Sequence, residues 1–172
     1  MKKIISILLC VAICIGFSAC AMDDDTPKKE TNNEQQASEN SDETFKLNES
    51  AVFEKLKFVA TDIKETQGTD FFTPEEGNVF VGIKFEIENI SQEEQTISTL
   101  LLFDGYVDDV KCEYSFSASC AFDEGTIDGE VAAGKKLVGW YALEVPADWQ
   151  EIELNVKSTW LSNNSAKFVF EK

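Results

Sequence analysis

Hydrophobic and polar positions alternate over a long stretch in the middle of the chain. In NVFVGIKFEIEN, residues 78–89, every odd-numbered position from Val79 to Ile87 is branched aliphatic or aromatic, and most even-numbered positions are small or charged. A repeat of two is typical of a β-strand with one buried face and one exposed face. We therefore predict a strand over residues 78–89 whose odd-numbered side chains lie in a hydrophobic core.

Shorter apolar stretches with the same character follow and precede this one. They predict further strands at residues 53–63, 96–103, 110–116, 137–145, 152–157 and 167–170. Turn-forming residues separate the strands, for example Asp104–Gly105, and Pro146 is expected to end the strand before it. No stretch has a convincing helical period. Seven or more short strands without a helix predict an all-β, antiparallel β-sandwich.

The first twenty residues have a different pattern. Lys2 and Lys3 precede an almost wholly apolar run, Ile4 to Phe17. A helix of that length would rise about 20 Å, which is too short for a hydrocarbon core of about 30 Å. A charged start followed by a short apolar run is typical of a secretory signal peptide. We predict that residues 1–19 are such a signal and are removed.

The signal ends in Phe17-Ser18-Ala19-Cys20, which resembles the lipobox of bacterial lipoproteins. In that family the cysteine thiol receives a diacylglyceryl group and the chain is cut just before it. The resemblance therefore implies that Cys20 anchors the protein to the cell membrane at its extracellular face. The alternative is an ordinary signal peptide whose cleavage site happens to lie near a cysteine.

Residues 20–50 are rich in acidic and amide side chains, with hardly an apolar residue before Phe45. Such a segment buries too little surface to offset its ordering entropy, so we predict a disordered tether. Its reach would be about 30 Å root-mean-square. Asp23–Asp25 are interpreted as a solvated charge run. The folded domain is then expected over residues 51–172.

Charge excludes several functions. The chain has 15 lysines against 32 acidic residues and contains neither arginine nor histidine. A surface this acidic repels nucleic acid, so no nucleic-acid partner is expected. Histidine-dependent triads and imidazole metal sites are likewise excluded, and no cofactor is predicted. Because like charge also disfavours an anionic membrane surface, attachment would have to come from the acyl chains.

Two cysteines remain after the signal and the lipid site are accounted for. Seven residues lie between Cys112 and Cys120, in a chain that we expect to be exported. An even pair in such a chain is a candidate disulfide, which would contribute about 2–3 kcal/mol in the chain-entropy view. Two free thiols are the alternative.

Three segments resemble a known family. They are Gly77–Ser98, Leu101–Asp109 and Glu130–Pro146. Together they resemble the telokin-like domain of unknown function in Gram-positive lipoproteins, which is similar to the immunoprotective extracellular antigens. Ala133 and Leu143 stand where the family usually has proline and phenylalanine. The resemblance implies an immunoglobulin-like sandwich and an envelope location, and it implies no catalytic residue.

Aromatic residues outside the core pattern are the main binding candidates. Phe80 and Trp140 lie on the strand faces opposite the predicted core, and Phe71 and Phe72 sit together in a loop. Exposed aromatic side chains that gather into a patch are typical of binding surfaces. The alternative, which we favour, is that loops cover Phe80 and Trp140 as a small satellite cluster. Trp149 and Trp160 are expected to pack in the core or at its edge.

Acidic residues offer two weaker alternatives. Asp104, Asp108 and Asp109, with Asp123 and Glu124, could surround calcium, but their spacing lacks the helix–loop–helix pattern and solvated loop carboxylates are favoured. A carboxylate pair could hydrolyse glycosides, but a sandwich of this size rarely forms a deep cleft. The sequence thus favours a non-catalytic binding or adhesion module for an envelope protein or wall polymer. The calcium-dependent module and the accessory hydrolase remain as alternatives.

Overall fold

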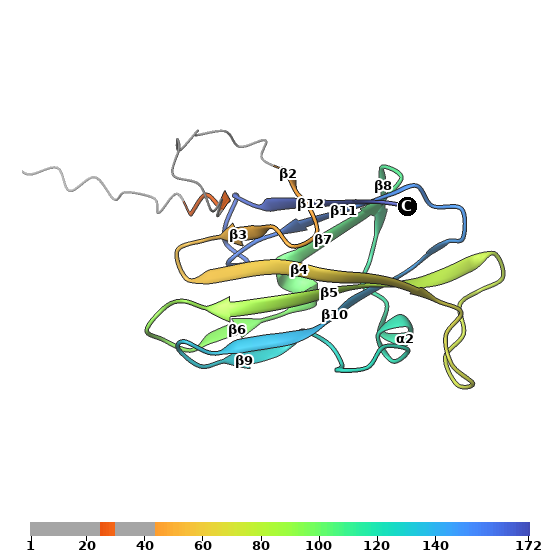
Figure 1. Cartoon of the computed structure of the whole chain (residues 1–172), viewed down its shortest axis with the longest axis horizontal. Coiled ribbons are helices and arrows are strands. Elements are labelled where there is room, and N and C mark those ends of the chain that lie inside the picture. The colour runs from red at the N-terminus through yellow and green to blue at the C-terminus, as the bar shows by residue number, and fades with distance from the viewer. Residues whose placement is uncertain (1–24, 30–43) are drawn as a thin grey trace, which may run out of the picture.

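The computed structural model describes residues 25–29 and 44–172, and two β-sheets make up most of it (Figure 1). The signal peptide, Cys20 and most of the expected tether lie outside these residues. The elements are β1 Lys28–Lys29, β2 Thr44–Phe45, β3 Ser50–Val52, β4 Leu56–Thr66, β5 Asn78–Asn89, β6 Gln95–Ile97, α1 Thr99–Leu102, β7 Phe103–Val107, β8 Val110–Cys112, α2 Phe116–Ser119, β9 Gly129–Val131, β10 Lys136–Pro146, β11 Glu151–Val156 and β12 Ala166–Glu171. Within the described part of the chain, neither helix is long and apolar enough to cross a bilayer.

The strands form a β-sandwich, as predicted. One five-stranded sheet, sheet A, has the order β1-β3-β4-β5-β10, and sheet B has the order β2-β12-β11-β7-β8. The pairings are antiparallel except for β2, which runs parallel to β12. A small third sheet pairs β6 with β9. In Figure 1 the long strands of sheet A lie in front, with sheet B behind and above them.

The alternating pattern of residues 78–89 forms β5 with the predicted bounds. Its odd-numbered side chains are buried in the core, where the Phe85 ring lies edge-on to Phe103 and Phe168, with centroids 5.4 Å away in both pairs. Tyr141 of the neighbouring strand stacks on Phe103 at 5.1 Å. The core therefore contains aromatic rings from both sheets that pack against one another.

One predicted strand is wrong. Residues 96–103 do not form a single strand but divide into β6, helix α1 and the start of β7. The break is fixed by Thr99, whose backbone N–H and hydroxyl both donate to the Asp128 carboxylate, at 2.8 and 3.1 Å. That contact comes from a loop 29 residues away, so no local pattern contains it. The strand expected at 110–116 is also shorter: β8 ends at Cys112, and helix α2 begins at Phe116.

The predicted turn at Asp104–Gly105 is likewise wrong, because both residues lie within β7. Gly105 is needed there for space: a Cβ atom would lie 2.8 Å from the carbonyl oxygen of Cys112 on the paired strand. Glycine inside a strand often marks such a close backbone approach. The turn comes later, where Asp108 and Asp109 both adopt positive φ between β7 and β8.

The folded part also begins earlier than residue 51. Phe45 in β2 is fully buried against Phe168, and residues 25–29, expected in the tether, contact the sandwich. Lys28 and Lys29 pair with Val52 and Ala51 at the edge of sheet A. The short polar stretch could not reveal this, because its pairing partner is supplied by β3.

A three-residue contact joins the two sheets at the opposite end. Glu65 at the end of β4 accepts a hydrogen bond from the Trp149 indole nitrogen at 2.6 Å and forms an ion pair with Lys172 at 2.7 Å. The Lys172 ammonium also lies 5.1 Å from the centroid of the Trp149 ring. The hydrogen bond from Lys172 holds the pKa of Glu65 below its ordinary value of 4.5, although burial acts in the opposite direction. The hydrogen bond from Trp149 lowers the pKa further.

This contact predicts a pH-dependent stability difference. A carboxyl whose pKa is lowered by folding stabilises the folded state fully above its unfolded pKa, and the contribution is lost as the pH falls through the folded pKa. Urea unfolding of wild type and Glu65→Gln should therefore differ by a constant amount at neutral pH. The difference should shrink below pH 4.5. Glu76→Gln, in an exposed loop, is the control, and a Glu65→Gln difference that persists unchanged in acid would contradict the assignment.

Candidate functional site

Phe80 and Trp140 are buried and do not form a binding surface. Phe80 is fully buried with Ala118 and Ala142 beneath the segment that includes α2, and Trp140 is 2% exposed. This corrects their place among the binding candidates and agrees with the satellite cluster that the sequence favoured. The rings are hidden because a loop crosses the outer face of sheet A.

That loop, residues 115–126, is here called the covering segment. Its backbone bonds to the free edge of β10: the Ser115 N–H donates to the Ala142 carbonyl, and the Gly125 carbonyl accepts from the Trp140 N–H. Phe122 stacks on Trp140 at 5.0 Å, and the indole nitrogen donates to the Glu124 carboxylate at 2.9 Å. The segment therefore protects an edge strand and closes a second, smaller core.

Two glycines in the sheet make room for the covering segment. A Cβ atom on Gly139 would lie 2.6 Å from the Thr126 carbonyl oxygen, and one on Gly82 would lie 2.8 Å from the Phe122 ring. Gly82 lies in β5 and Gly139 in β10, two strands that consist mostly of large side chains. In the sequence they are the available signal that another part of the chain approaches this face.

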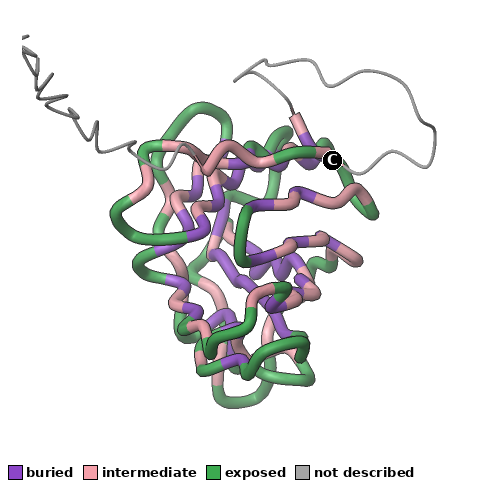
Figure 2. The backbone as a smooth tube through the Cα atoms, turned by 90° about the vertical axis from the view of Figure 1, so that its left-hand side faces the viewer, coloured by how far each residue is buried: buried purple, intermediate pink, exposed green. Residues whose placement is uncertain are grey.

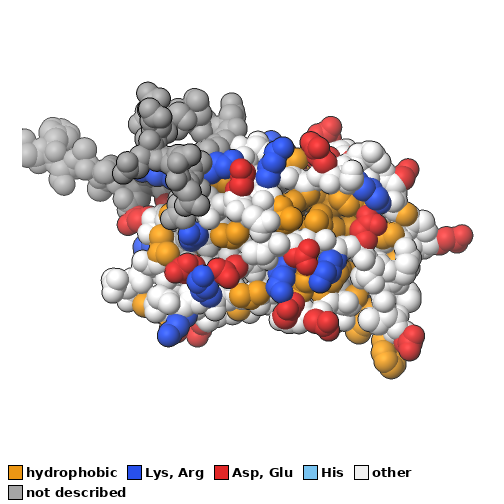
Figure 3. Space-filling view, in the orientation of Figure 1, with side chains coloured by type: hydrophobic (Ala, Val, Ile, Leu, Met, Phe, Trp, Pro, Cys, Tyr) orange, Lys and Arg blue, Asp and Glu red, His pale blue; other side chains and the backbone are white. Residues whose placement is uncertain are grey.

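Phe71 is the predicted binding residue that the structure leaves exposed. It is 90% exposed in the loop between β4 and β5, whereas Phe72 is partly buried against the Phe80 cluster. The Thr69 hydroxyl accepts hydrogen bonds from the backbone N–H groups of Phe71 and Phe72, at 3.3 and 3.2 Å. Phe71 is thus held outward by a defined turn. A hydrophobic projection stands out in Figure 3 at the corner where Figure 1 places this loop.

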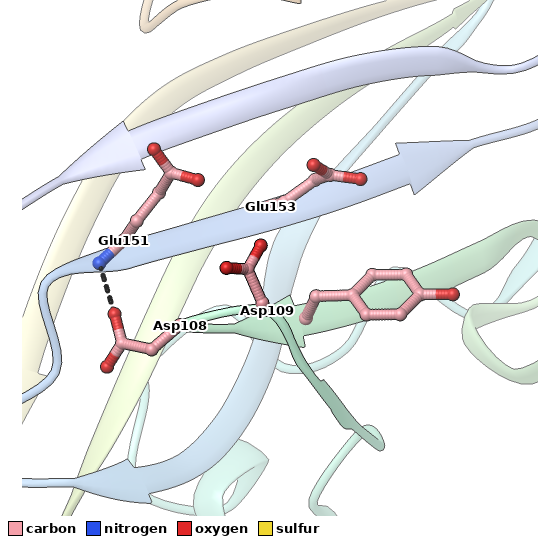
Figure 4. A pocket seen from close by; sticks show the side chains of 5 residues that line it. Asp108, Asp109, Glu151 and Glu153 are labelled. Atoms are coloured by element: carbon pink, nitrogen blue, oxygen red, sulfur yellow. Dashed lines mark hydrogen bonds between the residues drawn. The ribbon is translucent and has the colours of Figure 1, made fainter.

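A hollow of about 240 Å³ lies at the same end of the sandwich as the Phe71 loop. It is lined by Tyr106, Asp108, Asp109, Glu151 and Glu153. The aspartates form the two-residue β7–β8 turn, and both glutamates lie on β11 (Figure 4). A two-residue turn with positive φ at both positions suits aspartate better than most residues. The tight hairpin thus aims two carboxyl groups at the neighbouring strand.

Two of the four carboxylates have structural partners. Asp108 accepts hydrogen bonds from the backbone N–H groups of Gln150 and Glu151, at 3.0 and 2.9 Å, and so fixes the start of β11. Glu153 forms an ion pair with Lys167 at 2.8 Å. Burial opposes ionisation of Glu153, but the hydrogen bonds from Lys167 and Asn155 outweigh it, so its pKa lies below the ordinary value.

The chemistry of the hollow is that of a negatively charged recess. Its carboxylates attract cationic groups and repel phosphates and other anions. A glycosidase needs a general acid whose pKa is raised, and the pKa of Glu153 is lowered instead. The hollow therefore supports attraction of a positively charged group better than it supports the hydrolase alternative.

The calcium alternative fails in its proposed form. Asp104 pairs with Lys111 and Lys157, at 3.3 and 3.2 Å, rather than with other acids. Glu124 lies on the outer face of sheet A, bound to Lys84 at 2.7 Å, whereas Asp104 belongs to sheet B. Across residues 25–29 and 44–172, no three acidic or sulfur-containing side chains are grouped so that they could hold a metal ion.

Cys112 and Cys120 are unbridged in the structure, in contrast to the predicted disulfide. Cys112 ends β8, with its sulfur 3.6 Å from the Glu144 carbonyl oxygen, and burial raises the pKa of its thiol. Cys120 caps α2 and is exposed. Helix α2, absent from the prediction, separates the two residues and directs them into different surroundings.

Sequence reasoning missed Tyr106, Glu151 and Glu153 as lining residues. Tyr106 pairs directly with Glu153 across the β7–β11 ladder, a partnership between residues that are 47 positions apart. The Asp108–Asp109 pair between two alternating segments was the detectable signal, because it is a typical hairpin turn. Trp160 was expected to pack and is 66% exposed instead, while Trp149 is buried as predicted.

Solved structures with a similar fold come from bacteria. The chain superimposes on a putative lipoprotein from Bacillus subtilis with a TM-score of 0.57 and 14% identity, over 68% of this chain and 36% of that chain. An uncharacterized beta-sandwich protein from Clostridium difficile gives 0.52 and 16%, over 80% and 99%. A putative lipoprotein from Staphylococcus aureus gives 0.50 and 16%, over 71% and 87%. At this identity the likeness shows the fold alone.

The chain thus spans about a third of the length of the Bacillus subtilis protein. Among curated protein sequences, none matches it. One family does match, and it covers residues 45–167, which is nearly the whole sandwich from β2 to β12. The protein accordingly belongs to the family described as Domain of unknown function (DUF4352).

Proposed function

We propose that this protein is a lipid-anchored module of the bacterial cell envelope that binds a protein or wall polymer without catalysis. The lipobox resemblance at Cys20 supports the anchor and its extracellular side. The structural similarity to proteins from Bacillus subtilis and Staphylococcus aureus that are themselves described as putative lipoproteins supports the same location. Kinship with the telokin-like lipoprotein domains is part of this proposal.

The observation that carries the proposal is the arrangement of the two ends of the sandwich. Lys28 and Lys29 pair with β3 at one end, so the chain leads toward Cys20 from there. The Phe71 loop and the C-terminus lie at the other end (Figure 1), together with the β7–β8 turn whose aspartates line the acidic hollow. An anchored chain would therefore present Phe71 and the acidic hollow away from the membrane, toward the wall.

Binding to purified cell walls and to detergent-solubilised envelope proteins tests the proposal. Phe71→Ser should lower the affinity about tenfold, since an exposed aromatic anchor typically contributes more than 1 kcal/mol to an interface. Val138→Ser, at a 40%-exposed position on β10, is the matched control and should bind as wild type does. Equal binding by both variants would contradict a role for this end of the molecule.

A further inference from the structure

The first described residues fasten the N-terminal side of the chain to one end of the sandwich. The Asp25 carboxylate accepts hydrogen bonds from the Glu54 backbone N–H, at 2.7 Å, and from the Ser158 hydroxyl. Lys29 forms an ion pair with Glu49 at 2.6 Å, and its ammonium lies 5.7 Å from the centroid of the Phe45 ring. These contacts come from both sheets, so Asp25 has a fixed place at this end.

Exposed apolar residues gather at the same end. Trp160 and Leu161 are 66% and 70% exposed, in a turn that the Ser162 N–H closes by donating to the Thr159 carbonyl. This turn begins one residue after Ser158, which binds Asp25. Figure 2 looks onto this end of the molecule, where exposed loops surround the buried strands.

Helix α1 adds two more apolar side chains beside that turn. Leu100 and Leu101 are 75% and 59% exposed, and the Lys157 N–H donates to the Leu102 carbonyl, which joins the end of α1 to the start of the Trp160 loop. We call the four exposed side chains the anchor-side surface; they are Leu100, Leu101, Trp160 and Leu161. Large apolar side chains exposed together are a feature of protein–protein or membrane contact sites.

We propose that the anchor-side surface rests on the outer leaflet of the membrane that holds the Cys20 lipid. The inference rests on the proposed lipidation. Four residues lie between Cys20 and the fixed Asp25, so five steps of about 3.3–3.6 Å each keep the Cα atoms of these two residues within about 18 Å of each other. Tryptophan and leucine are suited to the boundary between headgroups and acyl chains. Because the connection between Asp25 and the lipid-bearing Cys20 is so short, the bilayer is the partner that we assign to the anchor-side surface.

Charge favours the same orientation. The whole chain carries a formal charge of −17, so contact with an anionic leaflet has an electrostatic cost. Docking by the anchor-side surface places the acidic hollow at the end that faces away from the headgroups. Screening over about 10 Å at ordinary ionic strength then weakens the repulsion between them.

Depth-dependent quenching of tryptophan fluorescence tests the proposal. The chain from Cys20 onward, with Cys112→Ser and Cys120→Ser, is coupled through Cys20 to a maleimide lipid in phosphatidylcholine vesicles. Trp140 and Trp149 are 2% and 3% exposed, so lipids with brominated acyl chains should quench only Trp160. We expect a partial loss of emission, bounded by the share of one tryptophan in three. The loss should disappear in Trp160→Ala.

A probe at the opposite end supplies the matched control. In Trp160→Ala combined with Phe71→Trp, the new tryptophan should escape quenching. Quenching at position 71, or its absence at Trp160, overturns the proposal. A spectral change at Trp160 that depends on protein concentration without vesicles would assign the surface to a second copy and also overturn it. Because the lipid is attached chemically in this experiment, a negative result would count against membrane contact of the anchor-side surface only. The natural lipidation of Cys20 is tested separately, by Cys20→Ser.

Discussion

Replacing Trp140 by alanine is expected to lower the free energy of unfolding by about 3–5 kcal/mol, the range for deleting a large buried aromatic side chain. The ring is almost fully buried and stacked on Phe122, and its indole nitrogen is hydrogen-bonded to Glu124. Its removal leaves a cavity beneath the covering segment and takes one of two hydrogen-bond donors from the Glu124 carboxylate, which keeps its contact with Lys84. Native stability is only about 5–15 kcal/mol, so this is a large share. Urea unfolding measures the change.

Trp160→Ala is the control for this prediction, because the chain offers a second tryptophan of opposite exposure. Trp160 is 66% exposed, so Trp160→Ala should change the free energy of unfolding by no more than about 0.5 kcal/mol. Wall binding by Trp140→Ala, measured where the variant is still folded, should match wild type. If Trp140→Ala unfolds like wild type but loses binding, Trp140 is a contact residue and the covering segment must open in solution.

Replacing Cys20 by serine is expected to move the protein from the membrane fraction into the medium. Serine has no thiol to acylate, and two acyl chains at about 0.8 kcal/mol per buried CH₂ supply most of the attraction that holds the protein at the membrane. With Lys2 and Lys3 removed, 13 lysines remain against 32 acidic residues, a formal charge near −19 that opposes binding to anionic lipid. The anchor-side surface alone should not retain the protein.

Cell fractionation followed by immunoblotting makes the measurement, with Cys120→Ser as a control that should remain with the membrane. The mass of the released chain shows whether the signal has been removed. Cys20→Ser protein that has lost its signal and still sediments quantitatively with membranes would show that attachment does not depend on a lipid at this residue.

The sequence by itself determined the class of fold, because a period of two along residues 78–89 can bury one face only as a strand in a sheet. It also determined the excluded chemistry, since a chain without histidine or arginine lacks the groups that triads and phosphate clamps require. Composition and local alternation carry this information residue by residue. The strand bounds predicted from the sequence are wrong where a residue distant in sequence makes the deciding contact. One example is Asp128, which binds Thr99 and breaks a predicted strand.

Only the tertiary structure decided which aromatic side chains reach solvent. Trp140 and Trp160 are the same residue type, but a loop folds over the first while the second occupies a turn that begins one residue after Ser158, which binds Asp25. The acidic hollow likewise exists only because β7 and β11 pair and bring Tyr106 to Glu153. The exposure of a side chain and its neighbours across the sheet depend on contacts between segments that are remote in sequence. A local sequence pattern holds no information about such contacts.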